Sequence, residues 1–157
     1  MKKSLLEILS EDLRSSKEKA KSDLARYERD LDRYRSAAKM TYNKFANFAI
    51  GDLLEPSSYP EFKRLAEAAE KLYNKVSDDK YKLADLASDM FDEYQEDHDN
   101  EAYHLYQDIR KEEDKYTDVE YGMEVIHELG EKIVNAIDFL VEHNKLSHLK
   151  DFQQGIK

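Results

Sequence analysis

The chain has 157 residues, a formal charge of −10, 40% hydrophobic and 38% charged residues, and no cysteine. The absence of cysteine excludes disulfides, thiolate catalysis and cysteine-ligated metal sites. No apolar run approaches membrane-spanning length, and the amino terminus lacks the pattern of a signal peptide. We therefore expect a single domain at 1–157 with its own core, located in the cytoplasm.

The first predicted element is a long helix at about 4–50. Ser4 and Glu7 have the S-x-x-E spacing of a capping box, in which each side chain satisfies a backbone amide of the other residue. Apolar or small residues then recur at steps of three and four, which is the heptad spacing of a coiled coil. This seam comprises Leu6, Leu9, Leu13, Ser16, Ala20, Leu24, Tyr27, Leu31, Tyr34, Ala38, Thr41, Phe45 and Phe48.

A turn at 51–60 and a second helix at about 60–97 follow. Ser58 and Glu61 repeat the capping spacing. An apolar residue then recurs every seven positions, with companion residues between. The repeat is Phe62, Ala69, Val76, Leu83 and Met90, and the companions are Leu65, Leu72 and Leu86. The polar run at 77–80 interrupts the companions, so it is either a short turn or a polar layer in one continuous helix.

Two more helices and a tail complete the prediction. Residues 97–100 lack apolar side chains, and Asn100 suits the N-cap of a short helix at about 101–116. A longer helix at about 118–145 and a tail at 146–157 come next. The apolar faces hold Ala102, Leu105, Tyr106 and Ile109 in the short helix, and Val119, Met123, Ile126, Leu129, Ile133, Ile137 and Leu140 in the longer one.

No segment shows the period-two alternation of a β-strand. The sequence therefore predicts an all-α fold, an elongated helical bundle with long, antiparallel, coiled-coil-like helices. The seam of the first helix should pack on the second helix across the predicted turn.

The negative charge is concentrated in one segment. Residues 89–131 hold 16 acidic and 3 basic residues, a net charge of −13, whereas residues 1–50 carry a net charge of +4. Apolar and tyrosine residues are interleaved with these acids, which a solvated acidic tail would lack. We expect an ordered helical surface whose fixed carboxylates attract basic partners. The candidate partner-binding residues are Asp92, Glu93, Glu96, Asp97, Asp99, Glu101, Tyr103, Tyr106, Asp108, Glu112, Glu113, Asp114, Tyr116, Asp118 and Glu120.

Two Glu-x-x-His pairs, Glu101 with His104 and Glu124 with His127, have the spacing that di-iron helical bundles use. Such bundles also need a glutamate from each of two further helices, and they separate the two motifs by more than the 23 residues found here. Chance pairs are expected in a chain so rich in glutamate. No glycine-rich phosphate loop or nucleophile elbow occurs. The sequence thus predicts no catalytic residue, no metal site and no cofactor.

Three functions follow as hypotheses. The leading one is a non-enzymatic, acidic protein-interaction module: a small phage-type inhibitor, in the style of anti-CRISPR or anti-restriction proteins, that occludes a basic nucleic-acid-binding surface of a partner without binding nucleic acid itself. The first alternative is a structural or adaptor coiled-coil protein that forms homo-oligomers through the seam at 1–50. The second is a metal-binding helical-bundle enzyme that uses the Glu-x-x-His pairs. An acidic face that serves only solubility accounts for the charge equally well.

Overall fold

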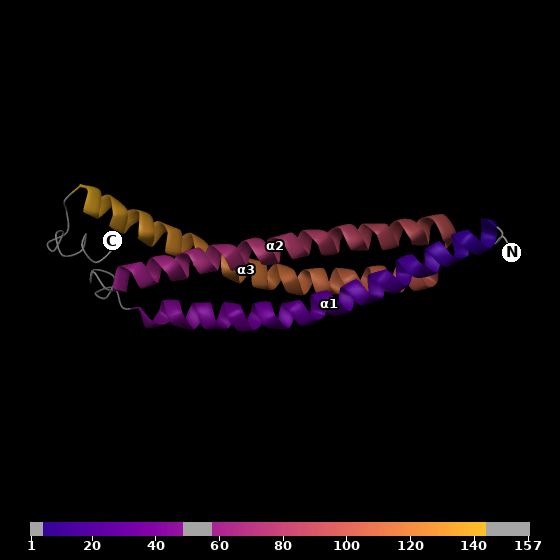
Figure 1. Cartoon of the computed structure of the whole chain (residues 1–157), viewed down its shortest axis with the longest axis horizontal. Coiled ribbons are helices and arrows are strands. Elements are labelled where there is room, and N and C mark those ends of the chain that lie inside the picture. The colour runs from indigo at the N-terminus through magenta and orange to yellow at the C-terminus, as the bar shows by residue number, and fades with distance from the viewer. Residues whose placement is uncertain (1–4, 49–57, 144–157) are drawn as a thin grey trace. The chain divides into compact units, whose positions relative to one another are not determined.

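The computed structural model describes residues 5–48 and 58–143, with only the backbone for residues 6–15, and it contains three helices (Figure 1). Helix α1 spans Leu5–Asn47, α2 spans Ser58–Asp97 and α3 spans Asn100–Glu142. No strand occurs within the described ranges. The predicted all-α helical-bundle class is therefore confirmed. The predicted tail and most of the predicted turn lie outside the described residues.

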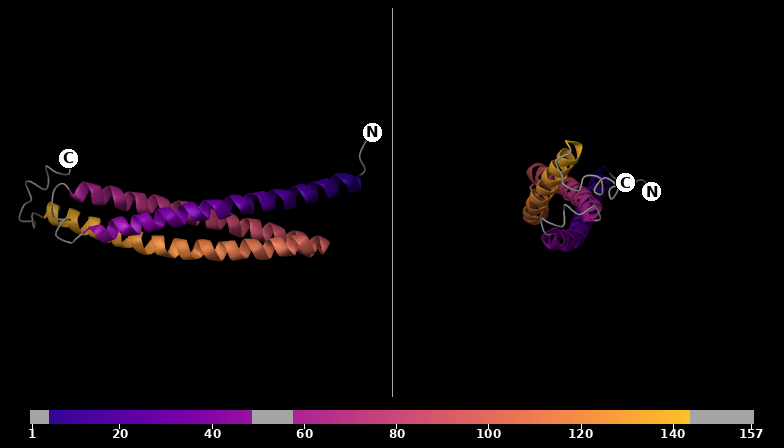
Figure 2. Two further views of the ribbon diagram at one scale, coloured as in Figure 1. Left: turned by 90° about the horizontal axis from the view of Figure 1, so that it is seen from below. Right: turned by 90° about the vertical axis from the view of Figure 1, so that its left-hand side faces the viewer.

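Packing divides the chain into two units, and every helix contributes to both. Unit 1 comprises Met1–Arg33 and Ser77–Asp118, and unit 2 comprises Tyr34–Val76 and Val119–Lys157. Within unit 1, Ser16 and Lys17 of α1 contact the end of α2 and the α2–α3 turn, so α1 runs beside the α2–α3 hairpin from this point onward (Figure 2). Each unit is thus built from one segment of each helix.

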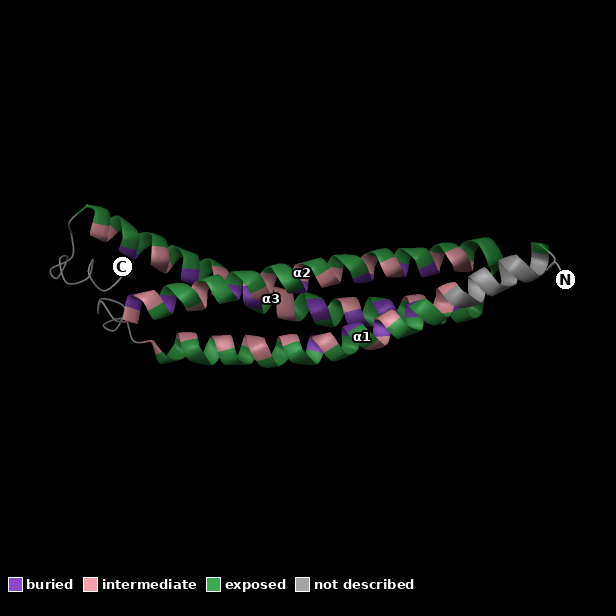
Figure 3. Cartoon of the chain, in the orientation of Figure 1, coloured by how far each residue is buried: buried purple, intermediate pink, exposed green. Residues whose placement is uncertain are grey.

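The predicted seam of α1 is its buried face. Ala20, Leu24, Tyr27 and Leu31 are buried in unit 1, and Tyr34, Ala38, Thr41, Phe45 and Phe48 are half-buried in unit 2. Figure 3 shows the buried and half-buried positions recurring along the helices between exposed ones. The seam residues before Ser16 lie among the side chains that are not described. Where side chains are described, the heptad spacing identified the core face of α1 correctly.

Helix α2 follows its predicted seven-residue repeat closely. All five residues of that repeat are buried: Phe62, Ala69, Val76, Leu83 and Met90. The helix runs without a break through 77–80, so the polar run is a layer within a continuous helix and not a turn. The Ser77 hydroxyl in this layer is buried, with no hydrogen-bond partner among the described residues.

Unit 2 has an aromatic core at the start of α2. The Phe62 ring packs edge-on against two rings of α1, with centroid distances of 5.3 Å to Phe45 and 5.4 Å to Phe48. Tyr59 is fully buried beside Phe62, and its hydroxyl donates a hydrogen bond to the Asp138 carboxylate of α3. Burial, together with this hydrogen bond, raises the pKa of Tyr59.

Helix α3 is continuous, which corrects the predicted break between 116 and 118. The Thr117 hydroxyl does not cap a new helix but donates to the Glu113 carbonyl 3.0 Å away, as it does inside a helix. One buried position recurs every seven residues along the whole helix. These positions are Ala102, Ile109, Tyr116, Met123, Gly130 and Ile137. Because a tyrosine and a glycine occupy two of them, the apolar pattern alone did not show that the repeat is unbroken.

The core face of α3 differs from the prediction at one further position. Leu129 was expected to lie in the core, but it is 53% exposed. The adjacent Gly130 occupies the core position instead, where a Cβ would meet the Phe45 ring at 3.1 Å and the Ala66 Cβ at 3.2 Å. Only a residue without a side chain allows α3 to approach α1 and α2 this closely.

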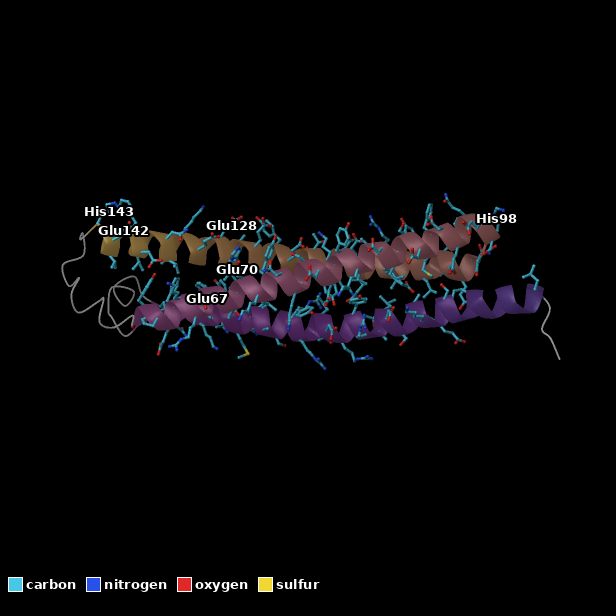
Figure 4. The ribbon with its side chains drawn as sticks, turned by 45° about the horizontal axis from the view of Figure 1, so that its top comes forward. Glu67, Glu70, His98, Glu128, Glu142 and His143 are labelled. Carbon is cyan, nitrogen blue, oxygen red and sulfur yellow. The ribbon has the colours of Figure 1, made fainter. Side chains whose placement is uncertain are left out.

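The α2–α3 turn is two residues long. His98, which Figure 4 labels at this end of the hairpin, has a φ of 52°, a left-handed conformation often found just after a helix. Asp99 Oδ1 accepts hydrogen bonds from the backbone amides of Glu101 at 3.0 Å and Ala102 at 3.3 Å. Asp99 is therefore the N-cap of α3, and the prediction that Asn100 caps this helix was wrong by one residue.

Candidate partner-binding surface

Unit 1 presents a row of acidic side chains along one face of α2. Asp85, Asp89, Asp92 and Glu96 are exposed, and they follow one another at steps of four, three and four residues. This spacing places them on one side of the helix, over a length of roughly 17 Å. We call these four residues the α2 acidic row.

The α2 acidic row forms no ion pair with the described side chains. The sequence contains no lysine or arginine between Lys82 and Arg110. Lys82 and Lys19 of α1 line the same groove as Asp85 and Asp89, whereas Asp92 and Glu96 lie farther along the helix. The row therefore presents an exposed line of carboxylates on the surface of unit 1.

The sequence prediction found half of this row and missed Asp85 and Asp89. Asp85 precedes the acidic segment at 89–131 and Asp89 is its first residue, and the prediction does not use the position of each acid around the helix. The signal was present in the sequence, since the i, i+4, i+7, i+11 spacing can be read once α2 is assigned. Asp85 and Asp89 also line a groove of about 290 Å³ between α1 and α2.

Four other predicted acids of unit 1 are also exposed and free of ion pairs with the described residues. They are Asp97 at the end of α2, and Asp108, Asp114 and Asp118 on α3. They extend the acidic surface of unit 1 beyond the α2 acidic row, so the negative charge of residues 89–131 reaches solvent on both helices.

Two predicted acids are engaged by lysines of α1. Lys17 Nζ lies 2.7 Å from Asp99 Oδ2 and 3.4 Å from Glu101 Oε2, and Lys21 Nζ also contacts Glu101. Hydrogen bonding to Lys17 is the main cause that lowers the pKa of Asp99, and hydrogen bonding to Lys21 is the main cause that lowers the pKa of Glu101. The same contact with Asp99 raises the pKa of Lys17. These carboxylates hold α1 against the hairpin and are less available to a partner.

Two further acids have partners within unit 1. Ser16 Oγ donates to Glu93 Oε1 at 2.6 Å, while Glu93 Oε2 is buried without a hydrogen-bond partner among the described residues. Glu113 Oε2 lies 3.0 Å from Arg110 Nη1, one helical turn earlier. Both carboxylates are half-buried and contribute less to the outer surface than the α2 acidic row.

Glu112 and Tyr116 lie in the interior, which corrects their assignment to the surface. Glu112 is only 3% exposed, and its Oε2 lies 3.6 Å from Lys115 Nζ. Tyr116 is fully buried, and its hydroxyl donates to the Tyr27 carbonyl at 2.6 Å. Both residues continue the buried face of Leu105 and Ile109 at steps of three and four, but a glutamate and a tyrosine do not belong to the apolar pattern on which the prediction depended. Glu120, the last predicted residue, is half-buried and belongs to unit 2.

The two predicted tyrosines, Tyr103 and Tyr106, belong to a half-exposed aromatic cluster with Phe91 and Tyr94 of α2. The ring centroids of Tyr94 and Tyr103 are 4.7 Å apart, and those of Phe91 and Tyr106 are 5.0 Å apart. Each ring packs across the hairpin and keeps part of its surface in solvent. The cluster therefore both joins α2 to α3 and offers an aromatic surface.

The two Glu-x-x-His pairs fall in different units. His104 is exposed in unit 1 beside the Tyr103 ring, and Glu101 of the same pair is held by the α1 lysines. In unit 2, His127 stacks on the Tyr73 ring at 5.7 Å, with its Nε2 3.7 Å from Glu131 Oε2. Among the described side chains, which are those of residues 5, 16–48 and 58–143, no three histidine or acidic groups converge in a way that could hold a metal ion.

None of the described helices is apolar over a length sufficient to cross a bilayer. Comparison of the chain with protein-family models, with curated proteins and with solved structures gives no match.

Proposed function

We propose that this protein is a non-enzymatic interaction module that binds a basic partner protein through the acidic surface of unit 1. In its most specific form, the proposal is a small inhibitor of the kind phages encode against CRISPR or restriction systems. It would occlude the partner's nucleic-acid-binding surface and would not itself bind nucleic acid.

The observation that carries the proposal is the exposed α2 acidic row. The row carries four carboxylates along roughly 17 Å of helix, and one DNA strand carries about five phosphates over the same length, so the two have a similar number of negative charges per unit length. A groove lined with lysine and arginine to bind phosphates would therefore meet a similar density of negative charge. Since the row lies on a helix, its charges are fixed before binding, which reduces the entropy lost on association.

Charge on this surface also argues against direct nucleic-acid binding. The phosphate backbone is repelled by a surface that carries Asp85, Asp89, Asp92 and Glu96 with no basic residue up to Arg110. The half-exposed aromatic cluster on the same hairpin supplies apolar contact area, and tyrosines are common among residues that dominate binding energy. Exposed charges that attract the partner and aromatic rings that contact it are both features of protein-interaction surfaces.

The test starts from the partner that a pull-down with the tagged chain recovers from its source cells. A triple variant, Asp89→Lys, Asp92→Lys and Glu96→Lys, should slow association with that partner by at least tenfold while the circular dichroism spectrum stays helical. The matched control is Glu61→Lys, Glu67→Lys and Glu70→Lys, three exposed acids on the same helix in unit 2 (Figure 4 labels Glu67 and Glu70). It changes the net charge equally and should leave association nearly unchanged.

A competition titration then tests occlusion. The chain should displace DNA or RNA from the partner, and its affinity should fall as salt rises, because screening weakens attraction between exposed charges. If the partner holds nucleic acid and this chain simultaneously, the inhibitor form of the proposal fails and only the interaction module remains. If both triple variants weaken binding alike, net charge is responsible and the α2 acidic row is not the site.

A further inference from the structure

Helix α3 has a second row of heptad-spaced residues in unit 2, separate from its core face. Gly122, Val125, Leu129, Lys132, Ala136 and Phe139 follow at steps of three, four, three, four and three, and all six are exposed. Val125, Leu129 and Phe139 are 49%, 53% and 55% exposed. We call these six residues the outer row. This spacing is that of a coiled-coil seam, but among the described residues no helix covers these side chains.

Gly122 is a second, independent observation about this face. A Cβ added at Gly122 would meet nothing within 4 Å, whereas one at Gly130 would touch Phe45 and Ala66. Glycine inside a helix is less stable than alanine, and at Gly130 the core packing accounts for it. At Gly122 the described chain supplies no such reason. Close approach of a side chain from another molecule would supply one.

The outer row is complementary to itself when a second copy runs antiparallel. In the layers of such an antiparallel coiled coil, Gly122 of one copy faces Phe139 of the other, and Val125 of one copy faces Ala136 of the other. The largest side chain in the row faces the residue that has none, and each remaining apolar pair combines a larger with a smaller residue. A two-fold interface requires this reciprocity, because each contact must occur twice with the roles exchanged.

We propose that α3 of unit 2 pairs with α3 of a second copy of this chain as an antiparallel, two-fold coiled coil along the outer row. The central layer joins Leu129 of one copy to Lys132 of the other. The Lys132 side chain then lies beside Glu128 of the copy that supplies Leu129. Its ammonium group thereby gains a carboxylate partner at the edge of the interface (Figure 4 labels Glu128).

Sedimentation equilibrium of the full chain over a wide concentration range tests the association. The wild type should dimerise, and Leu129→Lys should raise the dimer dissociation constant by more than tenfold, because it places a second lysine opposite Lys132 in both central layers. Tyr81→Lys, an apolar-to-basic change at an exposed position in unit 1, is the matched control and should leave the constant unchanged. Leu129→Lys should keep its melting temperature in dilute solution, since Leu129 is outside the core.

Cross-linking tests the antiparallel register. The chain contains no cysteine, so single variants Gly122→Cys and Phe139→Cys introduce the only thiols. A mixture of the two should form the 122–139 heterodisulfide upon mild oxidation, and neither variant alone should cross-link efficiently. A disulfide between two copies of Gly122→Cys would show a parallel pair and overturn this register.

A third outcome would show that residues of the same chain, and not a second copy, cover the outer row. A chain that stays monomeric at every concentration, and in which Leu129→Lys lowers the melting temperature, covers the outer row with its own residues and overturns the proposal. The test is separate from that of the proposed function. Since the outer row is in unit 2, Leu129→Lys should bind the partner of unit 1 as the wild type does.

Discussion

At the level of single residues, Asp99 has two roles that can be separated by substitution. Its side chain caps α3 by accepting from two backbone amides, and it also pairs with Lys17 of α1. Asp99→Asn keeps an acceptor for the cap and loses the charge, whereas Asp99→Ala loses both. We expect Asp99→Ala to lower the free energy of unfolding by about 1 kcal/mol more than Asp99→Asn does.

The charge of Asp99 also predicts a dependence on pH. Its pKa in the folded chain is below its ordinary value of 3.8, chiefly because of Lys17. A depressed pKa contributes stability that is present above pH 3.8 and is lost as the pH falls through the folded value. Urea unfolding should therefore find wild type more stable than Asp99→Asn at pH 6, with the difference vanishing near pH 2. A difference independent of pH would show that the ion pair contributes nothing.

Substitution of Tyr116 tests whether this side chain stabilises the core or belongs to the partner-binding surface. It is fully buried, packs edge-on against Tyr27 and donates to the Tyr27 carbonyl. Tyr116→Ala should lower the free energy of unfolding by about 3–5 kcal/mol, as other large-to-small aromatic changes in cores do. Tyr81→Ala, at a position 72% exposed, should change it by less than about 0.5 kcal/mol. Denaturant titration of both variants measures this difference in the free energy of unfolding. If Tyr116→Ala is as stable as the wild type, Tyr116 is not a core residue and remains a candidate for partner binding.

At the level of elements, heptad register decides which side chains of α3 face inward. Gly130 is where this register is tightest, because Phe45 and Ala66 leave no room for a side chain. Gly130→Leu should therefore lower the free energy of unfolding by about 1–3 kcal/mol or more, although leucine favours helix more than glycine does. Asn135→Leu, at an exposed position of the same helix, is the control and should be close to neutral. Equal melting temperatures for the two variants would mean that α3 has another register.

The seams of α1 and α2 predict a similar contrast for charge. Leu31 is 2% exposed, so Leu31→Asp places an unpaired carboxylate in the core of unit 1. We expect a loss of at least about 3 kcal/mol in the free energy of unfolding. Ser36→Asp, an exposed position one turn later, should leave thermal melting nearly unchanged. If Leu31→Asp melts at the wild-type temperature, the buried face of α1 has been misassigned.

At the level of the whole molecule, net charge opposes folding. The chain carries −10, and most of the ion pairs described above have at least one exposed partner, which limits what such pairs contribute. Repulsion among acids should therefore outweigh attraction between ion pairs. We expect the melting temperature to rise between about 0.05 and 0.5 M salt, because screening weakens that repulsion. A falling melting temperature would show that the ion pairs, such as Lys17 with Asp99, dominate the electrostatic free energy.

The sequence by itself determined the helical class and most of the core faces. Heptad spacing is a local property that survives in any helical packing, so Leu24, Leu31, Val76 and Leu83 could be assigned to the core without knowing their neighbours. The concentration of acids could be counted directly as well. These conclusions depend only on residue type and separation along the chain.

The tertiary structure decided the positions where residue type and environment disagree. Glu112 and Gly130 occupy core positions, although neither residue type marks a core face in the sequence, because packing against the other helices decides which face of α3 is buried. Which acids keep their charge at the surface depends on α1, since Lys17 and Lys21 neutralise Asp99 and Glu101 from about 80 residues away in sequence. Spacing along one helix cannot reveal such pairs, because they form only when separate segments of the chain are brought together.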